Sequence, residues 1–256
     1  MTRPMHGRIG IITGATAGIG RATATALAQQ GVRLVVNGRR AEVLDEVVQE
    51  LGKDAATAVV GDCASPDVIE AMFAAARTTF GDDADLVVVN AGRGLWGGLR
   101  DSDETQWEEM IRTNLLGAAR LMRAAANTML KDPALGRWQE RAHDIVVIGS
   151  VVGRHVSPFS GAYGGTKFAV HALAEGLRRD VGPKGIRVTL IEPGFVVSEF
   201  QGVAGYEPQW FQGMVEKLGP ALEAADVADA ITFTVSRPMR VHVGDIVLRP
   251  TRQDYP

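Results

Sequence analysis

The feature that most constrains the fold of this chain is the alternation of apolar, strand-like runs with segments of helical period. The runs are rich in Val and Ile with little polar alternation, which is typical of strands buried on both faces of a parallel sheet. Such strands are expected at residues 9–13, 33–37, 57–60, 86–90, 144–148, 187–192 and 245–248. Helices are expected at residues 18–30, 40–51, 66–80, 104–130, 162–181 and 225–236.

This succession predicts an α/β fold, a doubly wound, Rossmann-type parallel sheet of about seven strands with helices on both faces. A length of 256 residues suits one such domain, and neither an internal repeat nor a linker divides residues 1–256. Sheets of this kind bind ligands at the carboxyl ends of their strands. Functional residues are therefore expected directly after the predicted strands.

The composition argues against several classes of function. Apolar residues make up 46% of the chain and charged residues 22%, which is ordinary for a globular enzyme. The net charge of −3 gives no reason to expect nucleic-acid or membrane binding. The single cysteine, Cys63, excludes an internal disulfide and fits a reducing compartment.

Signals for membranes, secretion and metals are equally weak. No apolar run reaches the roughly 18 residues of a membrane helix, and residues 1–8 are too short and polar for a secretory signal. A cytoplasmic protein is therefore expected. The histidines are scattered without metal-ligand spacing, so no metal site is expected.

A glycine-rich turn joins the first predicted strand to the first predicted helix. Gly14, Gly18 and Gly20 there would let the backbone approach a pyrophosphate, while the helix N-terminus offers free N–H groups and positive potential. Their spacing is G-x-x-x-G-x-G and not the G-x-G-x-x-G of the standard dinucleotide fingerprint. A tight strand–helix connection with no ligand is the alternative.

Tyr163 and Lys167 stand one helical turn apart in the predicted helix 162–181, so they face the same way. A free tyrosine ionises near pH 10 and is a poor base at neutrality, but a neighbouring ammonium favours the phenolate. The pair would then exchange a proton with an alcohol at physiological pH. The same spacing also occurs on ordinary amphipathic helices.

Six motifs in this order and spacing resemble the short-chain dehydrogenase/reductase family, over residues 7 to 250. They are Thr13-Gly14-x-x-x-Gly18-Ile19-Gly20, Asn90-Ala91-Gly92, Asn114, Ser150, Tyr163-x-x-x-Lys167 and Pro193-Gly194. The C-terminal Arg249-Pro250-Thr251-Arg252-Gln253 resembles the NADP-preferring branch of 3-hydroxy-acid dehydrogenases and small-aldehyde reductases. One departure is Val89, where the family usually has a second asparagine that helps to brace the cofactor floor.

The resemblance implies an NADP(H)-dependent oxidoreductase that transfers hydride between nicotinamide and a small aldehyde, ketone or hydroxy acid. Tyr163 would be the acid/base, Lys167 would lower the tyrosine pKa and bind the nicotinamide ribose, and Ser150 would polarise the substrate oxygen. Asn114 would disturb its helix locally and anchor a water that relays protons. The alternative for Asn114 is a solvent-facing side chain.

The cofactor preference follows from the end of the second predicted strand. Gly38 stands where an NAD enzyme places an acid, and Arg39 follows it. A guanidinium would bind the 2′-phosphate by charge and paired N–H bonds, with Arg40 assisting. The alternative is that both arginines only solvate the start of a helix.

The family pattern assigns further contacts to the cofactor. Asp62 would contact the adenine amino group, Cys63 would contribute a backbone N–H from a loop, and Val196 with Ser198 would hold the carboxamide. The full expected cofactor set is Gly14, Thr16, Gly18, Ile19, Gly20, Arg39, Arg40, Asp62, Cys63, Asn90, Ala91, Gly92, Tyr163, Lys167, Pro193, Gly194, Val196 and Ser198.

The expected substrate pocket is apolar. It comprises Trp96, Val152, Phe159, Tyr206 and Trp210, with residues 195–218 forming a lid that closes on the substrate. Arg93, Arg154 and His155 stand close enough to the catalytic strands to bind an anionic substrate, or else they are surface and loop residues. The substrate's identity is not specified by these residues.

Several alternatives remain at this level. A 3-oxoacyl-thioester reductase would need a basic docking patch that the sequence does not show, and a non-catalytic NADP-binding regulator would not need all four catalytic residues. The alanine- and leucine-rich helices 104–130 and 162–181 would pair between subunits, which predicts a homodimer or homotetramer. The polar connection 132–143, which contains Trp138, is a solvated loop or a partner contact.

Overall fold

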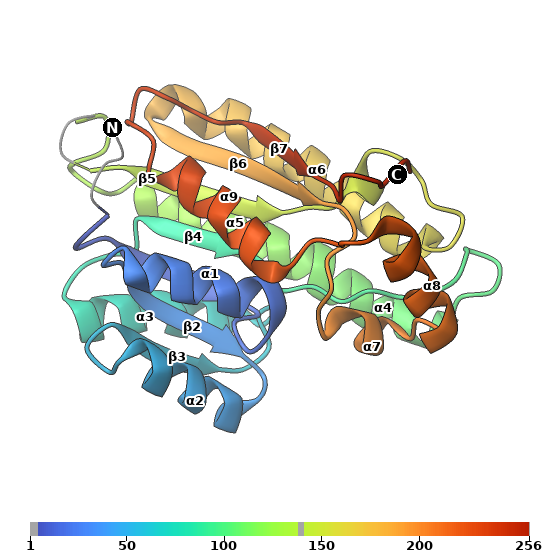
Figure 1. Ribbon diagram of the computed structural model, residues 1–256. Coiled ribbons are helices and arrows are strands. Elements are labelled where there is room, and N and C mark those ends of the chain that lie inside the picture. Colours follow the sequence, from blue (N-terminus) through green and yellow to red (C-terminus); the bar gives the residue numbers. More distant parts are fainter. Residues whose placement is uncertain (1–4, 138–140, 256) are drawn as a thin grey trace.

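The computed structural model describes residues 5–137 and 141–255, which form a seven-stranded parallel sheet with helices on both faces (Figure 1). The strand order is β3-β2-β1-β4-β5-β6-β7. The strands are β1 (Ile9–Thr13), β2 (Arg33–Gly38), β3 (Ala56–Val60), β4 (Leu86–Val89), β5 (His143–Ile148), β6 (Ile186–Pro193) and β7 (Asp245–Leu248). The predicted Rossmann-type architecture is confirmed, and strand ends agree with the expected ones to within one residue.

Two helical layers cover the sheet (Figure 1). The strands are buried on both faces, so neighbouring residues of one strand enter different cores: Ile11 packs toward α3, α5 and α6, and Ile12 toward α1, α2 and α9. The main helices are α1 (Gly18–Gln29), α2 (Ala41–Leu51), α3 (Pro66–Phe80), α5 (Ala118–Met129), α6 (Gly161–Val181) and α9 (Ala224–Val235).

The strand order reverses between β1 and β4. The chain builds β1, β2 and β3 outward in one direction, and then returns through α3 to place β4 on the other side of β1. The loops after β1 and β4 therefore diverge at the carboxyl edge of the sheet. This divergence is the position at which doubly wound sheets bind ligands.

The segment predicted as one helix at residues 104–130 is interrupted. It consists of a 3₁₀ turn (Glu104–Gln106), α4 (Trp107–Ile111), a π-helical stretch (Arg112–Gly117) and α5. Asn114 lies in the π-helical stretch, and its side chain bonds the backbone of Arg93 through both its amide nitrogen and its oxygen. Single π-helical turns inside α-helices are frequent at functional sites.

Two short helices that the sequence pattern does not predict lie within residues 195–218. They are α7 (Phe200–Ala204) and α8 (Pro208–Leu218), both drawn in orange-brown at the carboxyl end of the sheet (Figure 1). Glu207 caps α8 by accepting hydrogen bonds from the backbone N–H groups of Gln209 and Trp210. Pro208 at the first helical position has no N–H that needs a partner.

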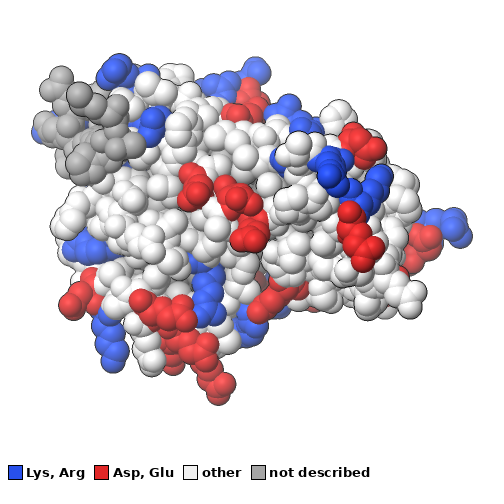
Figure 2. All heavy atoms as spheres, viewed as in Figure 1, with Lys and Arg blue, Asp and Glu red and all other residues white. Residues whose placement is uncertain are grey.

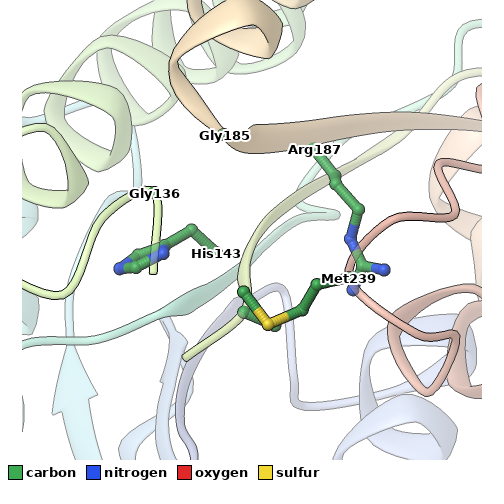
Figure 3. Close-up of a pocket in the computed structure, with 6 residues that line it drawn as sticks. Gly136, His143, Gly185, Arg187 and Met239 are labelled. Carbon is green, nitrogen blue, oxygen red and sulfur yellow. The ribbon is translucent and has the colours of Figure 1, made fainter. Parts of the chain in front are cut away.

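Buried ion pairs brace the sheet at the amino ends of its central strands. Arg8 pairs with Asp85 at 2.8 Å and with Asp144 at 2.9 Å, and Arg187 pairs with Asp144 at 2.7 Å. A small cavity lies beside these pairs, lined by Gly136, Ala142, His143, Gly185, Arg187 and Met239 (Figure 3). Because each buried charge has a partner, this cluster ties β1, β4, β5 and β6 together at the end remote from the cleft.

The described surface carries charges of both signs. On the face shown in Figure 2, acidic and basic side chains lie interspersed among uncharged residues. Within residues 5–137 and 141–255, no helix combines the length and apolarity needed to cross a bilayer, and no three His, Cys, Asp or Glu side chains could share a metal ion. Trp138 lies outside the described residues, so the role of the connection 132–143 is untested.

Candidate active site

A cleft of about 860 Å³ lies at the carboxyl edge of the sheet, which is within the range of ligand sites. The loops after the first six strands, β1 to β6, line it, together with α6, α7, α8 and residues 253–255. It thus occupies the strand-order reversal described above. All residues of the expected cofactor set except Gly20 line the cleft, as do the five residues of the expected apolar substrate pocket. Three of the four catalytic candidates line it too, the exception being Asn114.

The turn after β1 has backbone geometry that requires glycine. Gly14 and Gly18 have φ values of +68° and +52°, in the left-handed region that other residues avoid. Gly20 does not line the cleft, because it packs inside the turn, where a Cβ would lie 2.2 Å from the Gly14 carbonyl oxygen. The turn therefore places the N-terminus of α1 against the cleft, which suits a phosphate group.

The floor of the cleft is braced without a polar side chain at position 89. The Thr13 hydroxyl oxygen accepts hydrogen bonds from the backbone N–H groups of Asn90 (3.2 Å) and Ala91 (3.1 Å). The Asn90 amide donates to the Thr13 carbonyl oxygen at 2.8 Å. Val89 is buried in the core, so its departure from the family pattern leaves these bonds intact.

Two arginines stand at the outer end of the cleft. Arg39 pairs with Glu109 at 3.0 Å and Arg40 with Glu199 at 3.1 Å, and all four side chains are well exposed. A Cβ at Gly38 would lie 2.6 Å from Thr16 Cγ2, so a larger residue there would require the Thr16 side chain to move. β2 itself carries no acidic side chain.

Asp62 and Cys63 follow β3 and line the same end of the cleft. One Asp62 oxygen accepts the Ala64 N–H at 2.9 Å, and the other lies 2.6 Å from Arg112 Nη1. Burial, with the Asp62 charge, raises the pKa of the Cys63 thiol to about 11. The thiol therefore stays protonated at neutral pH, which agrees with a loop residue and not a reactive cysteine.

Tyr163, Lys167 and Ser150 come together where α6 passes the end of β5. Lys167 is buried, and its ammonium donates to the Ile148 carbonyl oxygen at 2.8 Å. Burial lowers the pKa of Lys167 to about 8. The Ser150 oxygen caps the following 3₁₀ turn (Val151–Gly153) by accepting the Val152 N–H at 3.3 Å.

The pKa of Tyr163 departs from the sequence-based expectation. Burial raises it, as does Tyr206 nearby, and a hydrogen bond with Ser150 opposes the rise. Lys167 Nζ lies 5.8 Å from the centre of the phenol ring, and it donates a hydrogen bond to the Ile148 carbonyl oxygen. The pKa of Tyr163 is thus raised, above all by desolvation, and not lowered by the lysine as expected.

Asn114 lies behind the cleft and not on its wall. It is buried, and its amide nitrogen donates to the Arg93 carbonyl oxygen at 2.8 Å and to Thr166 Oγ1 at 3.1 Å. Thr166 directly precedes Lys167 in α6. The alternative of a solvent-facing asparagine is therefore wrong, and the side chain links the π-helical stretch to the helix that carries the lysine.

Aromatic rings converge at the inner end of the cleft. Trp96 lies 4.4 Å from Trp210 and 5.1 Å from Tyr206 between ring centres, and it stacks on Phe159 at 5.6 Å. Three separate segments supply these rings, namely the loop after β4, the loop before α6, and α8 with the turn before it. Together they form an apolar wall beside Tyr163.

Of the three basic candidates for an anionic substrate, only Arg93 lines the cleft, and it pairs with Glu109. Arg154 is bonded to the buried Glu192 and lies 3.2 Å from Asp245. His155 is exposed and does not line the cleft. For Arg154 and His155 the loop alternative is therefore correct.

The comparisons with known proteins agree with this arrangement. A family model described as short chain dehydrogenase matches residues 8–207. The chain belongs to the short-chain dehydrogenase/reductase family. An uncharacterized oxidoreductase from Staphylococcus aureus strain MW2 is 32% identical over 243 residues, covering 95% of this chain and 97% of that one.

Solved structures of this family are similar over nearly the whole chain. A closed form of serine dehydrogenase complexed with NADP+ has a TM-score of 0.85 at 31% identity, covering 96% of each chain. An alcohol dehydrogenase from the archaeon Thermococcus sibiricus, complexed with 5-hydroxy-NADP, has a TM-score of 0.81 at 28% identity, covering 97% of this chain and 99% of that one. The chain is thus a short-chain dehydrogenase/reductase-type oxidoreductase.

The structure of this short-chain dehydrogenase/reductase adds residues to the site that sequence reasoning did not single out. Phe200 of α7 contacts the Tyr163 ring edge-on at 5.7 Å. Gln253 accepts the Phe195 N–H at 2.9 Å, which places the C-terminal segment against Gly194. The C-terminal motif was visible in the sequence, but it carried no indication of its position beside β6.

Proposed function

We propose that this chain is an NADP(H)-dependent oxidoreductase that interconverts a carbonyl and an alcohol on a small aldehyde, ketone or hydroxy acid. The observation that carries the proposal is the convergence of Tyr163, Lys167 and Ser150 in one cleft with a glycine-rich turn at a helix N-terminus. The cleft thus contains both a proton donor and a helix N-terminus suited to a phosphate group. Neither feature alone would favour this reaction.

The residues present fit a nicotinamide dinucleotide. The turn of Gly14 and Gly18 leaves backbone N–H groups of α1 against the cleft, and the Thr13–Asn90 bonds brace its floor. Lys167 would bind a ribose hydroxyl, and the Val196 backbone with Ser198 would hold a carboxamide. A bound nicotinamide would supply or accept the hydride.

The protein's own contribution to the reaction is proton management. Tyr163 would donate its phenolic proton to the substrate oxygen during reduction and accept it during oxidation. Ser150, which hydrogen-bonds with Tyr163, would stabilise charge on the same oxygen. Lys167 adds positive charge that favours phenolate, and Asn114 holds the helix that carries Lys167 through Thr166.

A preference for NADP(H) over NAD(H) rests on the outer end of the cleft. Arg39 and Arg40 line it, and no carboxylate stands at the end of β2 to repel a 2′-phosphate. Both arginines are exposed and pair only with exposed acids, so a phosphate could replace those acids at small cost. The NADP ligands of the similar serine and alcohol dehydrogenases support the same assignment.

The aromatic wall favours a substrate with an apolar part. The rings of Trp96, Tyr206 and Trp210 contact one another beside Tyr163, and α7 and α8 would close over the substrate as a lid. Arg93 is the cation from the expected set that lines the cleft, although Glu109 already pairs with it. The similarity to a serine dehydrogenase supports including hydroxy acids among candidate substrates.

A homodimer or homotetramer in the cytoplasm is part of the proposal. The helical segments 104–130 and 161–181 pack against each other, and both carry large apolar side chains that are more than a third exposed. These residues are Ile111, Leu116, Phe168 and Leu173. Covering them with a second copy would remove apolar surface from water. The four residues belong to α4, the π-helical stretch and α6.

The test is the change in NADPH absorbance with a defined panel. It comprises 4-nitrobenzaldehyde as an apolar aldehyde, succinic semialdehyde as a carboxylate-bearing aldehyde, acetoacetyl-N-acetylcysteamine as a thioester, and L-serine with NADP+ as a hydroxy acid. Turnover of one group, lost in Tyr163→Phe, supports the proposal and identifies the substrate class. Tight NADPH binding without turnover of any member would contradict it in favour of a cofactor-binding regulator.

A further inference from the structure

A second cluster of polar side chains lies on the far side of the Ser150 turn from the cleft. His171 follows Tyr163 and Lys167 on the same face of α6, at the next four-residue step. Its Nε2 accepts the backbone N–H of Ser150 at 3.2 Å. The cluster contacts the catalytic serine through the backbone, and its side chains do not line the cleft.

The imidazole fills the space beneath the whole turn. A Cβ at Gly149 would lie 2.3 Å from His171 Nε2, and a Cβ at Gly153 would lie 2.4 Å from His171 Cε1. Both ends of the turn therefore pack directly on the ring. Since Ser150 lies between them, the ring restricts the backbone that carries the serine hydroxyl.

Two further residues determine how the ring is held. Nε2 accepts a hydrogen bond, so in the neutral ring the proton belongs to Nδ1, which lies 3.6 Å from Glu192 Oε2. Glu192 is fully buried at the end of β6. Arg154 compensates its charge by bonding both carboxylate oxygens, and the same guanidinium reaches Asp245 of β7 at 3.2 Å.

We propose that His171, oriented by Glu192 and Arg154, is a positioning residue that holds Ser150 in its reactive orientation. This inference rests on the proposed function, because it assumes that Ser150 acts on the substrate oxygen. The imidazole accepts the Ser150 N–H at Nε2, while Glu192 places a negative charge 3.6 Å from the opposite nitrogen. Arg154 makes the burial of that carboxylate tolerable.

The arrangement works only with a neutral ring, because an imidazolium has no acceptor for the Ser150 N–H. The charged groups that face the ring are Lys167 on α6, Arg154 after β5 and Glu192 on β6. Burial, and then the Lys167 and Arg154 cations, lower the pKa of His171 to about 4. The acceptor is therefore present throughout the neutral range and is lost as the pH falls through about 4.

The experiment compares His171→Leu, which removes the acceptor, with His171→Gln, whose amide oxygen restores one. Arg178→Gln, on an exposed part of α6, is the matched control. Turnover with 4-nitrobenzaldehyde and NADPH, NADPH affinity by fluorescence, and hydrogen exchange of the segment 149–153 are measured for each. His171→Leu should lower kcat about tenfold, as expected for one lost orienting hydrogen bond, with NADPH affinity unchanged.

In His171→Leu the amide hydrogens of residues 149–153 should exchange faster than in the wild type. In His171→Gln both the exchange rate and kcat should return toward the wild-type values. Arg154→Gln should move the acid limb of the kcat profile to higher pH, because removing that cation raises the pKa of His171. Wild-type exchange in His171→Leu would overturn the proposal. So would a normal kcat in that variant while Ser150→Ala is inactive.

Ser150→Ala separates the two proposals. If it retains wild-type turnover, the role of Ser150 in the proposed function is wrong, and hydrogen exchange alone still decides whether His171 holds the turn. If Ser150→Ala is inactive and His171→Leu is unaffected, only the positioning role fails. Exchange of segments outside 149–153 shows whether either variant has lost its fold.

Discussion

Lys167 Nζ lies 5.8 Å from the centre of the Tyr163 ring, one turn along the same face of α6. The lysine is buried and its nearest protein partner is a backbone carbonyl oxygen, at 2.8 Å. Its pKa is lowered by burial while that of the tyrosine is raised by burial. Burial therefore shifts both pKa values toward the neutral forms, while the lysine, with a pKa of about 8, still carries its charge at neutral pH.

Tyr163→Phe should lower turnover by about 10²- to 10⁴-fold, because the proposed function makes this phenol the proton donor to the substrate oxygen. NADPH affinity should change little, since the ring itself is kept. Steady-state kinetics with the responsive panel member and a fluorescence titration check this. Turnover within a few-fold of the wild type would rule out the acid/base role.

Arg39→Asp should weaken NADPH binding about ten- to a hundred-fold, since a charge-assisted bond to the 2′-phosphate is replaced by a repulsion. NADH, which lacks that phosphate, should bind nearly as before. Titrations of both cofactors provide the measurement, with Arg179→Gln on α6 as a matched control for loss of an exposed arginine. Equal losses for the two cofactors would contradict the assignment.

Burial of Lys167 should make stability depend on pH in a defined direction. Its folded pKa is about 8, below its ordinary value of 10.5, so the unfolded chain binds more protons between these values. The free energy of unfolding of the wild type, relative to Lys167→Met, should therefore rise by about 2 kcal/mol from pH 7.5 to 9.5. Urea denaturation of both proteins across this range measures the difference, and parallel pH curves would contradict it.

Trp210→Ala should raise KM for 4-nitrobenzaldehyde and lower kcat/KM about tenfold, because it removes a ring of the aromatic wall. NADPH affinity should be unaffected. Phe211→Ala is the control on the same helix, since Phe211 stacks on Phe195 at 5.4 Å and does not line the cleft. Similar losses in both variants would indicate damage to α8 and not a substrate contact.

The double variant Leu116→Glu and Phe168→Glu should shift the protein toward monomers, because it places charge on the exposed apolar surface of the 104–130 and α6 helices. Light scattering after gel filtration gives the molar mass. Phe233→Glu is a matched control, as Phe233 is 49% exposed on α9. An unchanged oligomer in the double variant would place the subunit interface elsewhere.

Local patterns were sufficient wherever neighbouring residues decide the structure. β1 and β7 have the expected bounds because their apolar runs are short and end at turn residues. α3 begins at Pro66 and ends before Gly81 in the left-handed conformation, both of which are local signals. The helices of residues 195–218 were missed because glycines and scattered aromatics there obscure any helical period.

The π-helical stretch marks the limit of such patterns. A helix was expected from 104 to 130, and only the bonds between Asn114 and Arg93 reveal why it is distorted. Arg154 and His155 show the same limit for function. Both stand near Ser150 in the chain, but Arg154 turns to Glu192, a residue 38 positions away, and neither lines the cleft.

The sequence by itself determined the α/β alternation, the glycine-rich turn, the Tyr163–Lys167 spacing and hence the family, because each depends on residues within a few positions of one another. Only the tertiary structure decided the direction of the Tyr163 pKa, the contact of His171 with Ser150 and the position of Gln253 beside Gly194. Desolvation and contact between distant segments depend on how strands and helices pack. That packing sums many weak interactions across the sheet, and no local pattern records its result.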